Sequence, residues 1–96
     1  MAKELKYQVE NMISHNGNKV PNQFILTDKR GNRYFQSYAT IIAKIDKKGN
    51  VTLDKEKWNY SSTTSKYRNL FLGEDTKETK EKIKLKIYKL KNLNIA

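Results

Sequence analysis

Residues 40–54 read TIIAKIDKKGNVTLD, and they give the clearest structural signal in the chain. Apolar residues stand at every second position from Ile41 to Ile45, a period of two that is typical of a β-strand. The turn-forming run DKKGN follows, with Gly49 placed to take a left-handed conformation, and VTLD returns as a second strand. We therefore predict a β-hairpin here; a helix over 40–45 is the alternative, because YATIIAKI contains no helix breaker.

Further strands are predicted on the N-terminal side of this hairpin. The apolar run NQFILTD at 22–28 and the aromatic run RYFQSY at 33–38 both have strand composition. Between them lies the turn DKRGN, in which Gly31 is available for a positive φ. Residues 1–19 alternate only weakly, so we expect an N-terminal arm or edge strand there and a single domain over 20–96.

The chain beyond the hairpin changes to helical spacing. In SSTTSKYRNLFLG, Tyr67, Leu70 and Phe71 have the spacing of one helix face. One of the preceding hydroxyl side chains can cap the first turn, and Gly73 stands where a left-handed C-terminal cap is expected. These signals predict a helix over about 63–72 whose apolar face packs against the sheet.

A second helix is predicted from near Asp75 to about residue 85, because Asp75 and Glu78 have capping-box spacing. The following run IKLKIYKLK alternates as a strand does but also fits a helix stripe, so both states stay open for residues 83–92, with an extended end favoured. Trp58 is expected to join the sheet to the first helix. The predicted fold is α+β: a small antiparallel sheet of three to four strands followed by two packed C-terminal helices.

Composition excludes several classes of protein. The 96 residues suit one domain, and the absence of cysteine excludes disulfides and thiolate metal sites. His15, the only histidine, lies in a polar turn-like segment, and we find no nucleophile with a base, no metal-ligand cluster and no phosphate-binding glycine loop. We expect no enzyme activity, no cofactor and no metal. No apolar signal or membrane-spanning run is present, so the expected location is the cytoplasm, with no membrane partner.

The charge balance predicts acidic partners. The net charge is +10, and the pI is near 9.8. Residues 77–96 hold seven lysines, Lys80 and Lys84 among them, against two glutamates. This Lys-rich segment is predicted to add affinity for a polyanion; a merely solubilising charged tail is the alternative.

Candidate nucleic-acid contacts fall at the start of the first predicted helix and in the DKRGN turn. A helix N-terminus offers unpaired N–H groups and a partial positive charge. Hydroxyl, cationic and amide side chains next to it are suited to bind phosphate or a base edge. A cap followed by a solvated polar face is the alternative. The candidate residues are Ser65, Lys66, Arg68 and Asn69 in the helix, and Arg30 and Arg33 in or beside the turn.

The aromatic run at 33–38 divides between two faces of a strand. Tyr34, Gln36 and Tyr38 share one face, and Phe35 and Ser37 share the other. One face must be core, and core packing is the favoured fate of most aromatic residues. Were the tyrosine face exposed, it would form a platform on which bases stack.

The runs VPNQFIL, YFQSYATIIAKID, GNVTLD, WNYSSTTSKYRNLFLGE and NLN, spread over about residues 20–93, resemble a family of small proteins of unknown function. That family is carried by phages, plasmids and other mobile elements of low-GC Gram-positive bacteria. The resemblance supplies no activity. It implies action on host or phage nucleic acid, or on a host protein, in a bacterial cell.

The expected function is therefore nucleic-acid binding, with DNA favoured over RNA, by an accessory protein of a phage or mobile element. The alternative is a protein that binds and inhibits or modulates a host factor such as a defence nuclease. An RNA-associated regulator is a third candidate, which the aromatic strand would suit. The sequence does not indicate an oligomeric state.

Overall fold

The hairpin predicted over 40–54 is present. In the computed structural model, which describes residues 7–94, β4 (Thr40–Ile45) pairs antiparallel with β5 (Val51–Asp54), and Ala43 lies opposite Leu53. The alternative of a helix over 40–45 is therefore wrong. The first six residues of the expected N-terminal arm lie outside the described residues.

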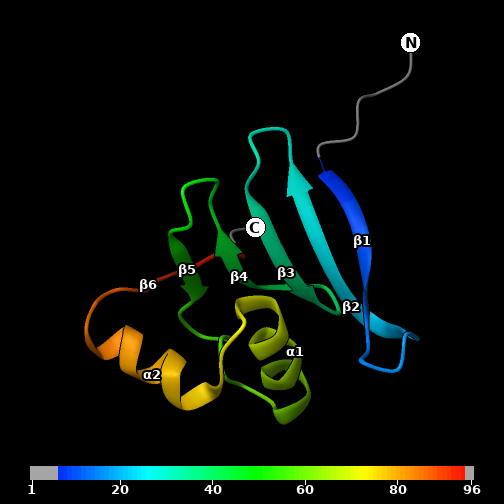
Figure 1. Cartoon of the computed structure of the whole chain (residues 1–96). Coiled ribbons are helices and arrows are strands. Elements are labelled where there is room, and N and C mark those ends of the chain that lie inside the picture. Colours follow the sequence, from blue (N-terminus) through cyan, green and yellow to red (C-terminus); the bar gives the residue numbers. More distant parts are fainter. Residues whose placement is uncertain (1–6, 95–96) are drawn as a thin grey trace.

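The sheet has six strands in sequence order, where three to four were predicted (Figure 1). β1 (Tyr7–Ile13), β2 (Lys19–Asp28), β3 (Arg33–Ser37), β4 and β5 form an antiparallel meander. After the two helices the chain returns as β6 (Lys89–Lys91), which lies parallel to β5. The two additional strands form the two edges of the sheet, and the extended C-terminal segment that was favoured for residues 83–92 is present as β6.

The core lies on one face of this sheet and centres on Phe35, Ile42, Ala43 and Leu53, all of them fully buried. The β3–β4 register shifts next to Phe35, so that two consecutive residues of β4 turn inward, as happens at a β-bulge. The ring of Phe71 covers this face from above, 6.0 Å from the ring of Phe35.

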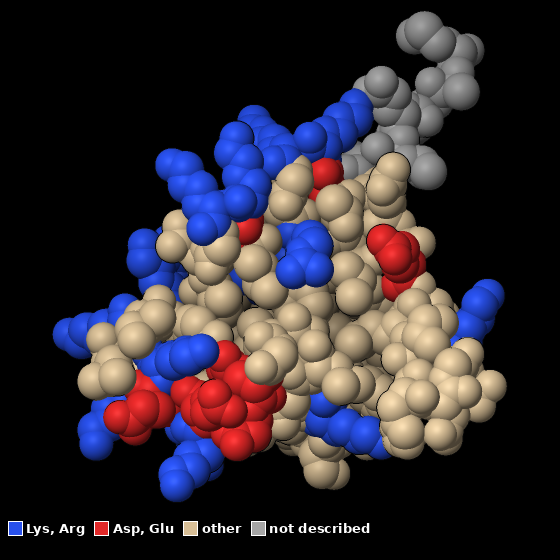
Figure 2. All heavy atoms as spheres, viewed as in Figure 1, with Lys and Arg blue, Asp and Glu red and all other residues tan. Residues whose placement is uncertain are grey.

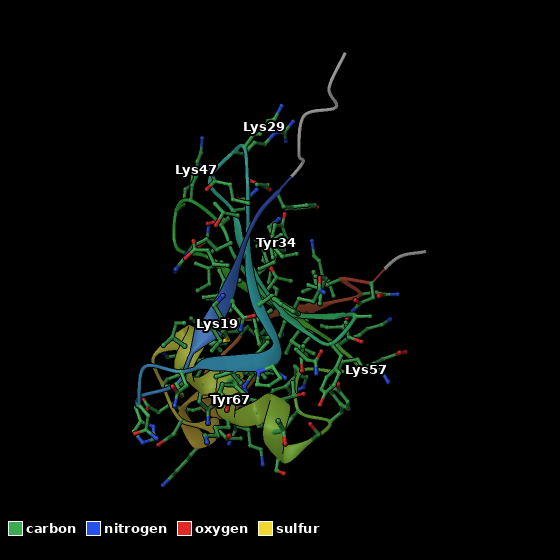
Figure 3. The ribbon with its side chains drawn as sticks, turned by 90° about the vertical axis from the view of Figure 1, so that its right-hand side faces the viewer. Lys19, Lys29, Tyr34, Lys47, Lys57 and Tyr67 are labelled. Atoms are coloured by element: carbon green, nitrogen blue, oxygen red, sulfur yellow. The ribbon has the colours of Figure 1, made fainter. Side chains whose placement is uncertain are left out.

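Two helices follow the meander: α1 (Ser62–Leu72) and α2 (Thr76–Lys84), close to their predicted bounds. The Ser61 hydroxyl accepts a hydrogen bond from the backbone N–H of Thr64 and caps α1, which ends at Gly73 with φ 72°. Asp75 and Glu78 form the predicted capping box at the start of α2. Both helices lie toward one side and one end of the sheet (Figures 1 and 3).

The buried face of α1 differs from the predicted one. Thr64, Arg68 and Phe71 point inward, whereas Leu70 is 55% exposed. The prediction that Leu70 packs against the sheet is wrong, because the inward stripe of this helix is set by polar contacts. The Thr64 hydroxyl, for example, lies 3.0 Å from that of buried Ser37 in β3.

The opposite face of the sheet carries the tyrosine side of β3. Phe35 and Ser37 are fully buried under α1, while Tyr34 and Gln36 are partly exposed and Tyr38 is 58% exposed. The prediction of core packing is therefore confirmed for Phe35 and wrong for Tyr38. We call the side of the sheet that carries Tyr34 and Gln36 the open face.

Candidate nucleic-acid interface

Two hairpin turns at one end of the sheet are built alike. In the β2–β3 turn, DKRGN, the Asp28 carboxylate accepts hydrogen bonds from the backbone N–H groups of Arg30 (2.9 Å) and Asn32 (3.0 Å). The Asn32 amide donates to the second carboxylate oxygen at 3.0 Å. Gly31 closes the turn with φ 88°, a conformation that glycine adopts at low cost.

The β4–β5 turn, DKKGN, repeats this arrangement. Asp46 accepts from the backbone N–H groups of Lys48 (2.9 Å) and Asn50 (2.9 Å), and from the Asn50 side chain at 3.2 Å. Gly49 has φ 90°. An aspartate, a glycine and an asparagine at these positions thus specify the turn. The identities of the two residues after the aspartate are not part of this pattern.

These two positions are basic in both turns. A Cβ placed on Gly31 would lie 3.5 Å from the Cβ of Lys47, so the two turns lie side by side. We call their four exposed cationic residues the basic tip: Lys29, Arg30, Lys47 and Lys48. Lys and Arg side chains gather at this end of the molecule in Figure 2, and Figure 3 shows Lys29 and Lys47 on neighbouring turns.

The two aspartates of the turns offset only half of this positive charge. Burial raises the pKa of Asp28, but hydrogen bonds from Asn32, Tyr34 and Arg30 outweigh it and lower the pKa overall. The pKa of Asp46 is lowered, chiefly by the backbone N–H of Asn50. Both carboxylates are committed to the turns, while the cationic side chains extend outward.

A hollow of about 680 Å³ lies next to the basic tip on the open face. Its walls are Tyr7, Tyr34, Lys44 and residues of the β2–β3 turn. The two tyrosine rings meet edge to face with centroids 5.7 Å apart, and the Lys44 ammonium lies 5.8 Å from the Tyr34 centroid. The hollow therefore combines aromatic surface with positive charge.

Tyr34 is fixed in this hollow. Its hydroxyl donates a 3.1 Å hydrogen bond to Asp28. Burial, together with this bond to a carboxylate, raises the pKa of Tyr34 to about 12. The ring is therefore neutral at physiological pH and its orientation is set by the neighbouring turn.

Two of the predicted site residues, Arg30 and Arg33, lie near this end of the sheet, but on different sides. Arg30 belongs to the basic tip. Arg33 is exposed and lies on the helix side, with its guanidinium 5.6 Å from the centroid of the Phe71 ring. Arg33 therefore borders the tip without facing the hollow.

Arg68 requires a correction, because it is fully buried. One terminal nitrogen donates to the Trp58 carbonyl (2.5 Å), and the other donates to Asn69 (2.9 Å) and Thr76 (2.8 Å). Its guanidinium also lies 5.1 Å from the centroid of the Trp58 ring. A guanidinium enclosed in this way cannot reach a phosphate outside the fold, so we no longer assign it to an interface.

Ser65 and Asn69 belong to the same internal network. Ser65 donates to the side chain of Asn59 at 2.9 Å, and Asn69 donates to Thr76 at 3.3 Å. Burial lowers the pKa of Arg68, and neutral oxygens carry most of its hydrogen bonds. The run from Trp58 to Asn69 therefore builds the junction of sheet and helix, and its polar side chains serve this internal network.

Lys66, Lys80 and Lys84 are exposed, but they lie on the helices. The Lys66 ammonium stands 5.4 Å from the ring centroid of Tyr67, a residue that Figure 3 places at the opposite end of the molecule from Lys29 and Lys47. On α2 the lysines alternate with exposed acids, seen as red atoms at the lower left of Figure 2. The structure therefore does not bring the predicted helix and turn residues into one patch.

Sequence reasoning assigned no ligand contact to Tyr7, Lys44, Lys47 or Lys48. The signal that identifies them is the repetition of one turn sequence, DKRGN and DKKGN, eighteen residues apart. A meander brings equivalent turns to the same end of a sheet, so the repetition predicts that their basic residues are neighbours.

Within residues 7–94, no three His, Asp or Glu side chains gather where they could hold a metal ion. No helix among the described residues has the length and apolar character needed to span a membrane.

The fold and this surface define a small α+β domain with one helix-covered sheet face and one open, basic and aromatic face. The chain belongs to a family of unknown function, DUF8033, whose sequence profile matches residues 7–87. No curated protein and no solved structure matches the chain.

Proposed function

We propose that this protein binds nucleic acid, DNA in the first place, through the basic tip and the adjoining open face. The observation that carries the proposal is the pairing of two equivalent turns whose aspartates are used internally while their lysines and arginine extend outward. The resemblance to phage and plasmid proteins supports a role as an accessory protein of a mobile element in the bacterial cytoplasm.

Physical considerations favour a polyanion as the ligand. Clustered cations attract phosphates over a long range, and their neutralisation releases condensed counterions, so affinity falls steeply as salt is raised. Arg30 can also bond a phosphate through two N–H groups at once, which a lysine cannot do. Lys44 extends the positive charge from the tip onto the open face, where it lines the hollow.

The test compares two triple variants that remove equal charge. The tip variant carries Arg30→Gln, Lys47→Gln and Lys48→Gln; the matched helix variant carries Lys66→Gln, Lys80→Gln and Lys84→Gln. Fluorescence anisotropy with labelled oligonucleotides is measured over a series of salt concentrations. We expect the slope of log K against log salt to fall by about 2 to 3 in the tip variant, and by less than 1 in the helix variant.

Two results would contradict this proposal. One is the absence of any salt-dependent binding by the unmodified protein at micromolar concentration. The other is an equal loss of affinity in both triple variants, which would mean that net charge matters and the basic tip does not.

A protein partner is the second candidate function, favoured by a different surface. Leu85 and Ile87 are 59% and 60% exposed, and they line a hollow of about 580 Å³ beside the acidic residues of α2. Exposed apolar residues that cluster in this way mark protein contacts in many small domains. A pull-down from host lysate distinguishes the candidates: a stoichiometric protein retained after nuclease digestion favours this second reading.

A further inference from the structure

We propose that the open face takes unpaired bases, so that the preferred ligand is single-stranded nucleic acid. This inference rests on the proposed function and specifies its substrate class. It depends on the hollow beside the basic tip and on an outward tyrosine at the far end of β3.

The hollow holds the surfaces that an unpaired base requires. Aromatic rings stack on the face of any base, and nearby cations hold the backbone. Tyr7 is 40% exposed and packs edge to face with Tyr34, whose hydroxyl is fixed by Asp28. Because the rings are already ordered, a stacked base would cost them little conformational entropy.

Tyr38 adds a second exposed aromatic side chain, in the turn between β3 and β4. Tyr38 follows the last residue of β3 and lies at the end of that strand away from the basic tip, four residues after Tyr34. Tyr38 has φ 56°, a left-handed conformation that is uncommon for a bulky residue, and its side chain is 58% exposed.

The Tyr38 backbone is held in this conformation from both sides. Its N–H donates to the carbonyl of Asn22 at 2.7 Å, and its carbonyl accepts from the Gln36 side chain at 2.7 Å. Backbone conformations of this uncommon kind cluster at ligand-binding and active sites. The tyrosines of the hollow and Tyr38 thus offer aromatic rings near the two ends of β3, with the basic tip at the Tyr34 end.

Duplex nucleic acid could use only part of this surface. Its bases are stacked on one another, so a duplex can offer phosphates to the basic tip but no free base faces to the tyrosines. A single strand can offer phosphates to the basic tip and free base faces to the tyrosines, and stacking is worth about 1–3 kcal/mol per base. The geometry therefore favours single strands over duplexes of the same length.

The test uses the full chain with labelled single-stranded DNA, single-stranded RNA and duplex DNA of equal length. Tyr7→Leu keeps an apolar residue, and Tyr38→Gly removes the ring while relieving the positive φ. Tyr60→Leu is the matched control, because Tyr60 is 46% exposed and lies in the loop before α1. Circular dichroism melts confirm that each variant is folded.

We expect Tyr7→Leu and Tyr38→Gly each to weaken single-strand binding by about fivefold or more, with duplex binding changed by less than twofold. Tyr60→Leu should change neither. A preference for RNA over DNA single strands would still support the inference and would revise the proposed choice of DNA. Unchanged single-strand affinity in both variants, or a duplex preference, overturns the inference and leaves the proposed function standing. Failure to bind any of the three probes overturns both.

Discussion

At the scale of single residues, Arg68 shows how a charged side chain becomes part of a core. It lies one turn after Thr64 on the inward stripe of α1, where its planar guanidinium faces the Trp58 ring. From the sequence, Arg68 is predicted to be a surface cation like Lys66. Hydrophobic periodicity counts only apolar residues, so it does not detect an arginine that is buried by stacking and hydrogen bonding. Only the three-dimensional arrangement reveals the acceptors that Trp58, Asn69 and Thr76 supply.

Replacement of Arg68 therefore tests stability. We expect Arg68→Lys to lower the free energy of unfolding by about 2–4 kcal/mol, because lysine cannot bridge this set of acceptors and leaves several of them buried without a donor. Lys66→Gln, on the exposed side of the same helix, should change it by no more than about 0.5 kcal/mol. Urea denaturation measures both values, and a near-neutral Arg68→Lys would contradict the assigned role.

At the scale of elements, the sequence predicted the middle of the chain well. The 40–54 hairpin follows from the alternation of apolar residues and from the glycine in its turn. Both helices and their caps follow from the spacing of capping residues. The edge strands β1 and β6 depend on pairing with distant segments. β6 is only three exposed residues long, and it is secured by Asn94, whose side chain bonds both backbone groups of Ile41 (2.7 and 2.8 Å).

Glu74 ties the helical elements together. It lies between α1 and α2, its side chain is 3% exposed, and it accepts hydrogen bonds from Thr79 (2.6 Å), Lys82 (2.8 Å) and Tyr88 (2.5 Å). Burial raises the pKa of Glu74, but these three bonds outweigh it and lower the pKa below the ordinary value of 4.5. The same carboxylate, together with burial, raises the pKa of Tyr88.

A lowered folded pKa stabilises the fold at pH values above the unfolded value of 4.5, and this contribution is lost as the pH falls through the folded pKa. Glu74→Gln removes that contribution. We expect the variant to be about 1–3 kcal/mol less stable at pH 7, and to lose less stability than the unmodified protein as the pH falls below 4.5. Urea denaturation at a series of pH values measures this, and identical acid profiles would show that Glu74 is not the group responsible.

At the scale of the whole molecule, the candidate site differs from the predicted one. The sequence located net positive charge, the basic DKRGN turn and the tyrosine face of β3. The prediction did not use the repetition of that turn sequence at 46–50, so it missed the second, equivalent turn, which lies beside the first although Gly31 and Lys47 are sixteen residues apart in sequence. The prediction also assigned the start of α1 and the β2–β3 turn to one interface, whereas the fold places Tyr67 and the basic tip at opposite ends of the molecule.

In the proposed complex, nucleic acid contacts the basic tip and the open face, away from the helices. Amide chemical-shift mapping with ¹⁵N-labelled protein and a short single-stranded oligonucleotide tests it directly. We predict that the largest changes fall at residues 28–34, 38 and 44–50, with small changes in α1 and α2. Largest changes within α1 or α2, or none at saturating oligonucleotide, would contradict it.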